Sequence, residues 1–155
     1  MFRSQIVNIG IVGSYVPRRC GIATFSNHLA KSIAENVYRE RLSNGGPVRI
    51  VAVNDRDGAY QYGTEGMAEI GQHHREDYRI AADALNIGRI DAVILQHEYG
   101  LFGGDCGEYV FDLLDRLHKP LVATLHTVLS DPTEYGTTAI FAPVASATVL
   151  GNLSE

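Results

Sequence analysis

Short runs of β-branched residues, separated by loops and by segments with helical periodicity, constrain the fold of this chain most. Residues 6–12 have the sequence I-V-N-I-G-I-V, an almost continuous apolar run typical of a strand that is covered on both faces. Comparable runs occupy residues 48–53, 67–70, 91–96 and 121–125, and a weaker one occupies residues 147–150. Because helices must cover both faces of such strands, the pattern predicts an α/β fold.

Three helices are predicted between these strands. Apolar residues recur at spacings of three and four from residue 22, which predicts an amphipathic helix that ends before the breaker sequence S-N-G-G-P at residues 43–47. Residues 75–87 and 108–118 predict two more helices, and Pro120 follows the second. A weaker helix opens at Asp131. The expected inner faces are Ile22, Phe25, Leu29 and Ile33; Tyr78, Ala82 and Leu85; and Val110, Leu113, Leu114 and Leu117.

Strands and helices in this order predict a three-layer, Rossmann-like α/β domain with a mostly parallel sheet of about six strands. A chain of 155 residues fits one such domain over residues 1–155. Ligands of these sheets bind beyond the carboxyl ends of the strands, where the strand order reverses. Those ends are predicted at residues 13–21, 54–55, 96–104 and 126–127.

Charge and composition exclude several classes of partner. The net charge of −5 gives no electrostatic reason to expect a nucleic acid or an anionic membrane surface. No apolar run reaches the roughly 18–20 residues of a membrane span. The two cysteines, Cys20 and Cys106, stand far apart, which favours a reducing cytoplasm.

The loop after the first strand, G-S-Y-V-P-R-R-C-G, leads directly into a predicted helix. Free N–H groups at a helix start favour an anion such as a diphosphate, and Gly21 leaves room for one. Thr24 lies in the first turn, and Arg18 and Arg19 add positive charge. The loop lacks the glycine patterns of dinucleotide and P-loop sites. An ordinary strand–helix turn with solvated arginines explains the same residues.

Two further strand ends carry polar residues. Gln96, His97 and Glu98 follow an apolar strand, and four glycines follow within residues 100–107, which favours a substrate-shaping loop over a flexible surface loop. His126 follows the fifth strand, where a histidine binds a sugar hydroxyl, acts near a reacting centre, or is structural. The histidines and cysteines show no metal-ligand spacing, so no metal is expected.

Five ordered segments carry a resemblance to a known family. They are Y-V-P-R-R-C-G-I-A-T-F-S, V-A-V-N-D, H-R-E-D-Y, L-Q-H-E-Y-G-L-F-G-G and L-V-A-T-L-H-T-V-L-S-D-P. Over roughly residues 8–133, the chain resembles the N-terminal, acceptor-side domain of family 4 (group 1) retaining glycosyltransferases of the GT-B fold. It is most similar to the mannosyltransferase-like branch.

The resemblance implies transfer of a sugar from a nucleotide-sugar donor to a glycan or lipid acceptor, with retention and without a cofactor or metal. By motif, His126 would be the catalytic histidine near the transferred sugar. The donor diphosphate would lie at the loop of Arg19, Gly21 and Thr24. The acceptor cleft would be shaped by His97, Glu98, Gly103, Gly104 and Thr127. The resemblance implies a cytoplasmic location, including the inner-membrane surface.

One departure from the family concerns its donor-binding domain, which carries two glutamates separated by seven residues. No two glutamates of this chain have that spacing, so we expect the C-terminal donor-binding domain to be absent, through a truncation, a frameshift or a chosen boundary. The chain would then be an acceptor-side half that is inactive alone. Two alternatives remain: a stand-alone, non-catalytic module that binds sugar, phosphate or protein, and a different cofactor enzyme on the same kind of sheet.

Overall fold

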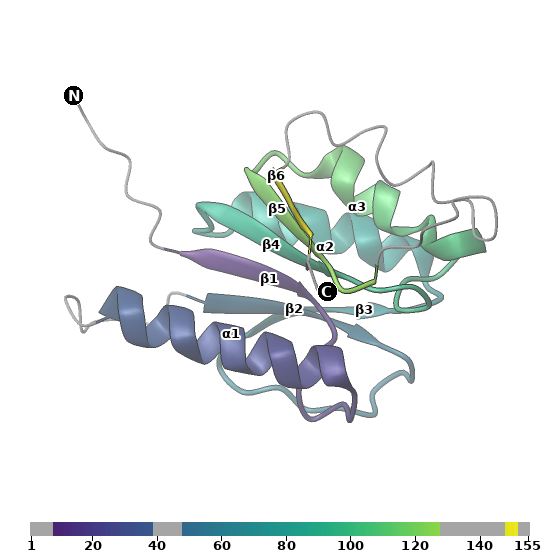
Figure 1. Ribbon diagram of the computed structural model, residues 1–155. Coiled ribbons are helices and arrows are strands. Elements are labelled where there is room, and N and C mark those ends of the chain that lie inside the picture. Colours follow the sequence, from purple (N-terminus) through teal and green to yellow (C-terminus); the bar gives the residue numbers. More distant parts are fainter. Residues whose placement is uncertain (1–7, 39–47, 128–147, 152–155) are drawn as a thin grey trace.

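The computed structural model describes residues 8–38, 48–127 and 148–151. Strands and helices alternate along most of the chain (Figure 1). In chain order they are β1 (Ile9–Gly13), α1 (Gly21–Tyr38), β2 (Val48–Asn54), β3 (Gly66–Gly71), α2 (Arg75–Ile87), β4 (Ala92–His97), the 3₁₀ turn η1 (Asp105–Gly107), α3 (Val110–Arg116), β5 (Leu121–Leu125) and β6 (Thr148–Gly151).

The strands form one sheet in the order β3-β2-β1-β4-β5-β6, and every neighbouring pair is parallel. Side chains are described for the five strands β1 to β5, and β6 extends the sheet beside β5. The chain runs outward from β1 to β3 and then returns to the other side of β1 as β4. The strand order therefore reverses between β1 and β4, and the predicted Rossmann-like α/β fold is confirmed.

Helices cover both faces of the sheet, with α1 on one side and α2 and α3 on the other (Figure 1). Alternation along the strands divides the core accordingly. Ile11 and Ile50 pack with Ala30 of α1, whereas Val12 and Val51 pack with residues of α2 and α3. The isoleucine and valine side chains among these are at most 1% exposed, and burying one stabilises the fold by about 1.5–3 kcal/mol. The two-sided core explains the nearly continuous apolar strands.

The inner face of α1 differs from the prediction at Phe25. That side chain is 44% exposed, while Ala23, Ser26 and Ala30 are buried. Ala23, Ser26 and Ala30 form the line of α1 that contacts the sheet, and their small side chains let the helix backbone lie close to it. The bulkier Leu29 lies beside this contact line and is partly buried. The spacing of large apolar residues alone therefore placed Phe25 on the wrong side.

The other helices follow the sequence closely. Helix α2 has the predicted bounds, and its predicted inner residues Tyr78, Ala82 and Leu85 are buried. Helix α3 is shorter than residues 108–118 because Leu117 has extended backbone angles, which ends the helix at Arg116. The weak helix predicted from Asp131 lies outside the described residues. Within the described part of the chain, no helix has the length and apolarity needed to cross a membrane.

Candidate functional site

The polar residues at the ends of β4 and β5 meet beside the reversal point of the sheet. His126 follows β5, and its ring nitrogen Nε2 lies 2.8 Å from the side-chain oxygen Oε1 of Gln96, the penultimate residue of β4. The backbone N–H of His126 donates to the carbonyl of His97 at 3.0 Å. The ring of His126 also meets the ring of Phe25 edge-on, with centroids 4.9 Å apart. The start of α1 therefore lies beside His126.

Gln96 is the buried support of this arrangement. Its side chain is 0% exposed, and its amide nitrogen lies 3.5 Å from Oγ1 of Thr124, the residue paired with it on β5. On the other side stands Gly13 of β1, where a Cβ atom would lie 2.8 Å from Cβ of Gln96. Only glycine at residue 13 avoids a clash with the first side-chain atom of Gln96, a contact that sequence spacing did not reveal.

Glu98 joins the loop after β4 to the loop after β5. Its carboxylate accepts a hydrogen bond from the Thr127 hydroxyl at 2.8 Å and another from the backbone N–H of Tyr99 at 2.9 Å. Glu98 and Thr127, both predicted as acceptor-cleft residues, are thus brought together next to His126. A carboxylate held in this way retains lone pairs for a donor group on a ligand.

His97 lies on the opposite face of β4 from Gln96, because successive strand residues alternate between faces. Its ring stacks on Phe102 at 5.7 Å between centroids, and its side-chain atom Nδ1 is buried without a hydrogen-bond partner in the described structure. Burial lowers the pKa of His97, and the nearby His126 lowers it further, while Glu98 opposes both effects. Both features favour a neutral, packed ring.

His126 is also held neutral, although less of it is buried. Partial burial lowers the pKa of His126 below its ordinary value, and the Glu98 carboxylate acts in the opposite direction. A neutral imidazole has one N–H donor and one lone-pair acceptor. Because Nε2 already faces Gln96, Nδ1 is the nitrogen left to hydrogen-bond a hydroxyl group, and the ring can do so without carrying charge.

The predicted donor-diphosphate residues surround the start of α1. Gly21 is exposed, and a Cβ atom there would meet nothing within 4 Å, so the space around it is open. Thr24 is exposed, and its hydroxyl donates to the Cys20 carbonyl at 3.3 Å. The first turn of α1 contains no acidic residue, which leaves the positive end of its dipole uncompensated from within the helix.

Arg19 lines a cavity of about 380 Å³ at the ends of β1 and β2. Arg18, in the same wall, donates to the carbonyl of Val53 at 3.0 Å and lies 3.8 Å from the Asp55 carboxylate. The hydroxyl of Tyr60 donates to Asp55 at 2.9 Å; this bond, followed by the charge of Arg18, lowers the pKa of Asp55. The other lining residues are Pro17, Cys20 and Arg56. Sequence reasoning missed Arg56 and Tyr60, which lie in a polar loop without a motif.

Gly103 and Gly104 lie in the loop after β4, just before the 3₁₀ turn η1. A Cβ atom at Gly103 would lie 2.0 Å from the backbone oxygen of Gln72, so the two chain segments pass in direct contact. Gly104 has φ of +84°, and a Cβ atom there would crowd Tyr109. Packing against the residues that follow β3 and precede α3 therefore accounts for both glycines, whose predicted place in an acceptor cleft stays a prediction.

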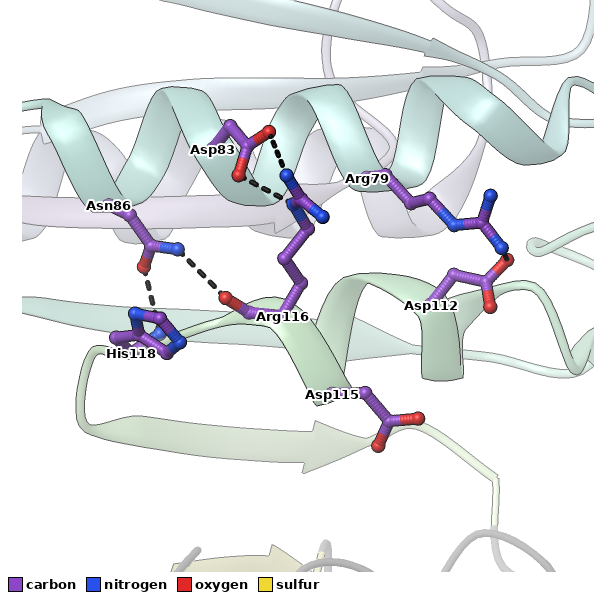
Figure 2. Close-up of a pocket in the computed structure, with 7 residues that line it drawn as sticks. All are labelled: Arg79, Asp83, Asn86, Asp112, Asp115, Arg116 and His118. Atoms are coloured by element: carbon purple, nitrogen blue, oxygen red, sulfur yellow. Dashed lines mark hydrogen bonds and ion pairs between the residues drawn. The ribbon is translucent and has the colours of Figure 1, made fainter.

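A second cavity, of about 520 Å³, lies on the outer surface between α2 and α3 (Figure 2). Its charged side chains pair across the two helices: Arg116 lies 2.6 Å from Asp83, and Arg79 lies 3.5 Å from Asp112. Asn86 adds hydrogen bonds to the backbone of Arg116 and His118. These groups satisfy one another, which makes the cavity a seam between helices rather than a site of chemistry.

Comparisons with family models, with curated proteins and with solved structures found no match. The fold and the site therefore define the protein's class by themselves: a Rossmann-like α/β domain with a polar site at the reversal of strand order. Among the described residues, no group of three or more His, Cys, Asp or Glu side chains is placed to hold a metal ion.

Proposed function

We propose that this chain is the acceptor-side domain of a retaining glycosyltransferase that uses a nucleotide-sugar donor. One observation carries the assignment: His126, held by Gln96, touches Phe25 in the second turn of α1. A group that recognises a hydroxyl and a helix start that favours an anion thus stand side by side. A nucleotide sugar carries hydroxyls and a diphosphate on one molecule.

In this function, the start of α1 would bind the donor diphosphate. Gly21 leaves open space for phosphate oxygens, and Arg19 supplies positive charge on the same loop. Developing negative charge on the leaving diphosphate is stabilised best by groups that are already oriented before the reaction. The N–H groups of Gly21 and Ile22 at the start of α1 would meet this requirement, whereas those of Ala23 and Thr24 already donate to the Sγ atom and the carbonyl of Cys20.

His126 would hydrogen-bond the transferred sugar as a neutral ring, because burial lowers its pKa. Glu98 and Thr127 would line the acceptor side, where the held carboxylate accepts from an acceptor hydroxyl. The finer assignments are a hexose as the transferred sugar, a glycan or lipid as the acceptor, and the cytoplasm, including the inner-membrane surface, as the location. Chemistry of this kind needs no resident metal when fixed dipoles and arginines compensate the diphosphate.

A complete donor site in this fold family lies between two Rossmann-like domains, so a second domain would supply the other half. We therefore expect the 155-residue chain to bind the diphosphate part of a donor weakly and to turn it over very slowly. Isothermal titration with GDP-mannose and UDP-glucose, and with GDP and UDP alone, measures the first property. Release of labelled nucleotide measures the second, beside a protein extended by the downstream reading frame.

The matched variants are His126→Ala and His28→Ala, since His28 is an exposed histidine on α1. His126→Ala should weaken nucleotide-sugar binding by about tenfold, equivalent to about 1.4 kcal/mol, and should leave GDP and UDP binding unchanged. His28→Ala should change neither. Rapid turnover by the short chain would contradict the half-enzyme assignment, and absence of any nucleotide or nucleotide-sugar binding at millimolar concentration would contradict the function itself.

A further inference from the structure

We propose that Gln96 is a positioning residue that fixes the tautomer of His126, so that the Nε2–H of the ring points into the protein and the Nδ1 lone pair is offered to a ligand. The assignment follows from contacts on the α1 face of the sheet. Its relevance to sugar recognition rests on the proposed function, whereas the tautomer itself does not.

The orientation of the Gln96 amide determines which ring nitrogen of His126 carries the proton. Its oxygen Oε1 lies 2.8 Å from Nε2 of His126, and its nitrogen lies 3.5 Å from Oγ1 of Thr124. An amide oxygen only accepts hydrogen bonds, so the His126 nitrogen facing it must carry the proton. Gln96 is 0% exposed, so its amide depends on the His126 ring and the Thr124 hydroxyl for its side-chain hydrogen bonds.

Three adjacent strands hold that amide in place. Gln96 is paired in register with Thr124 on β5, and on β1 Gly13 is close enough that a Cβ atom there would lie 2.8 Å from Cβ of Gln96. The side chain is thus confined between a glycine on one side and a hydroxyl on the other. Because the Gln96 side chain is already confined, little further conformational entropy is lost when it holds the His126 ring in one orientation.

The other ring nitrogen of His126 is left for a ligand. In the described part of the chain, Nδ1 of His126 makes no hydrogen bond. It is not fully buried either, so a ligand can reach it. The ionisable groups that act on the ring are Glu98 and His97, and Phe25 contacts it edge-on. A lone pair in this position accepts from a hydroxyl and repels an anion. His126 would therefore select a hydroxyl group, and not a phosphate oxygen.

Long-range ¹H–¹⁵N NMR of the ¹⁵N-labelled chain without ligand tests the tautomer directly. At a pH above the titration of His126, we expect a protonated Nε2 and an unprotonated Nδ1, with a ring proton on Nε2 that exchanges slowly with water. Free imidazole favours the same tautomer incompletely, so the effect of Gln96 is tested by comparing variants with the parent protein. An Nδ1–H ring in the parent protein would overturn the inference.

Gln96→Met removes the acceptor at similar volume and should abolish the slowly exchanging signal. Gln96→Glu keeps an acceptor and adds a charge, so the signal should remain and the titration midpoint of His126 should rise by about one pH unit or more. Gln72→Met is the matched control, because the Gln72 amide contacts the Gly100 carbonyl elsewhere. It should leave the His126 signals unchanged.

Unchanged His126 signals in Gln96→Met, or an equal change in Gln72→Met, would overturn the inference. If Gln96→Met does not fold, an unchanged midpoint in Gln96→Glu overturns it instead. None of these readouts needs a donor sugar. Failure of nucleotide-sugar binding therefore leaves the tautomer assignment standing, and a failed tautomer assignment leaves the binding result standing.

Discussion

The hydroxyl of Thr127 donates a 2.8 Å hydrogen bond to the carboxylate of Glu98, which connects the loops that follow β5 and β4. Replacing Thr127 by valine keeps the shape of the side chain and removes this bond. We expect the free energy of unfolding to fall by about 1 kcal/mol, as for the loss of a partly buried hydrogen bond. Urea unfolding monitored by circular dichroism measures it.

Thr24→Val is the matched control, because its hydroxyl makes only an exposed 3.3 Å bond to the Cys20 carbonyl. That variant should change stability by less than about 0.5 kcal/mol. Equal losses in the two threonine variants would contradict a special contribution from the bond between the loops.

Gly103 and Gly21 should respond oppositely to alanine. At Gly103 the added Cβ would lie 2.0 Å from the Gln72 backbone oxygen, so the two loops must separate. We expect a loss of about 2–3 kcal/mol, typical of overpacking. At Gly21 the added Cβ meets nothing within 4 Å, so stability should hold or rise slightly. Thermal unfolding of the two variants compares them, and a stable Gly103→Ala protein would be the contrary result.

The hydroxyl of Tyr78 satisfies two backbone groups at once. It donates to the Gln72 carbonyl at 2.8 Å and accepts from the Gly103 N–H at 3.0 Å. Tyr78→Phe leaves both groups without that partner and should cost about 1–3 kcal/mol. Tyr109→Phe is the control, since the hydroxyl of this neighbouring ring makes no hydrogen bond among the described residues. Denaturant midpoints that coincide for the two variants would argue against the bridging role.

Acid should destabilise the protein through His97. Burial lowers the pKa of His97 in the folded state below the ordinary value near 6.5. Above that value both states are neutral, and below it the unfolded chain binds a proton that the folded chain excludes. Stability should therefore fall as the pH drops below about 6.5, by at most about 1.4 kcal/mol per pH unit from this residue.

Urea unfolding at several pH values between 7.5 and 5 measures that slope. His97→Phe retains an aromatic ring against Phe102 and should make the dependence shallower. His28→Ala removes an exposed histidine and should leave the slope as it is. An identical slope in His97→Phe would assign the acid sensitivity to other groups.

Local pattern predicted most of the fold. The bounds of α2 and β5 follow from apolar spacing and from Pro120, because burial on both faces of a sheet leaves a clear signature. Helix α1 is the exception, since its contact line consists of Ala23, Ser26 and Ala30. Small residues mark close helix–sheet approach, and a count of large apolar residues does not register them.

The site could be predicted only in part. The polar residues that follow apolar strands pointed to His126 and Glu98, because strand ends are where parallel sheets place their ligands. The roles of Gln96 and Phe25 depend on contacts between segments about 30 and 100 residues apart, measured along the chain from His126. No local spacing encodes such pairings.

The contact between Gly13 and Gln96 links the histories of two positions that lie more than eighty residues apart. A Cβ atom at residue 13 would lie 2.8 Å from Cβ of Gln96, an atom that every residue except glycine carries, so a side chain at 13 requires glycine at 96 or a separation of the two strands. A lineage that kept the glutamine must also have kept the glycine. In a descendant with alanine at 13 and the same backbone, residue 96 would be glycine and the histidine beyond β5 would have lost its acceptor.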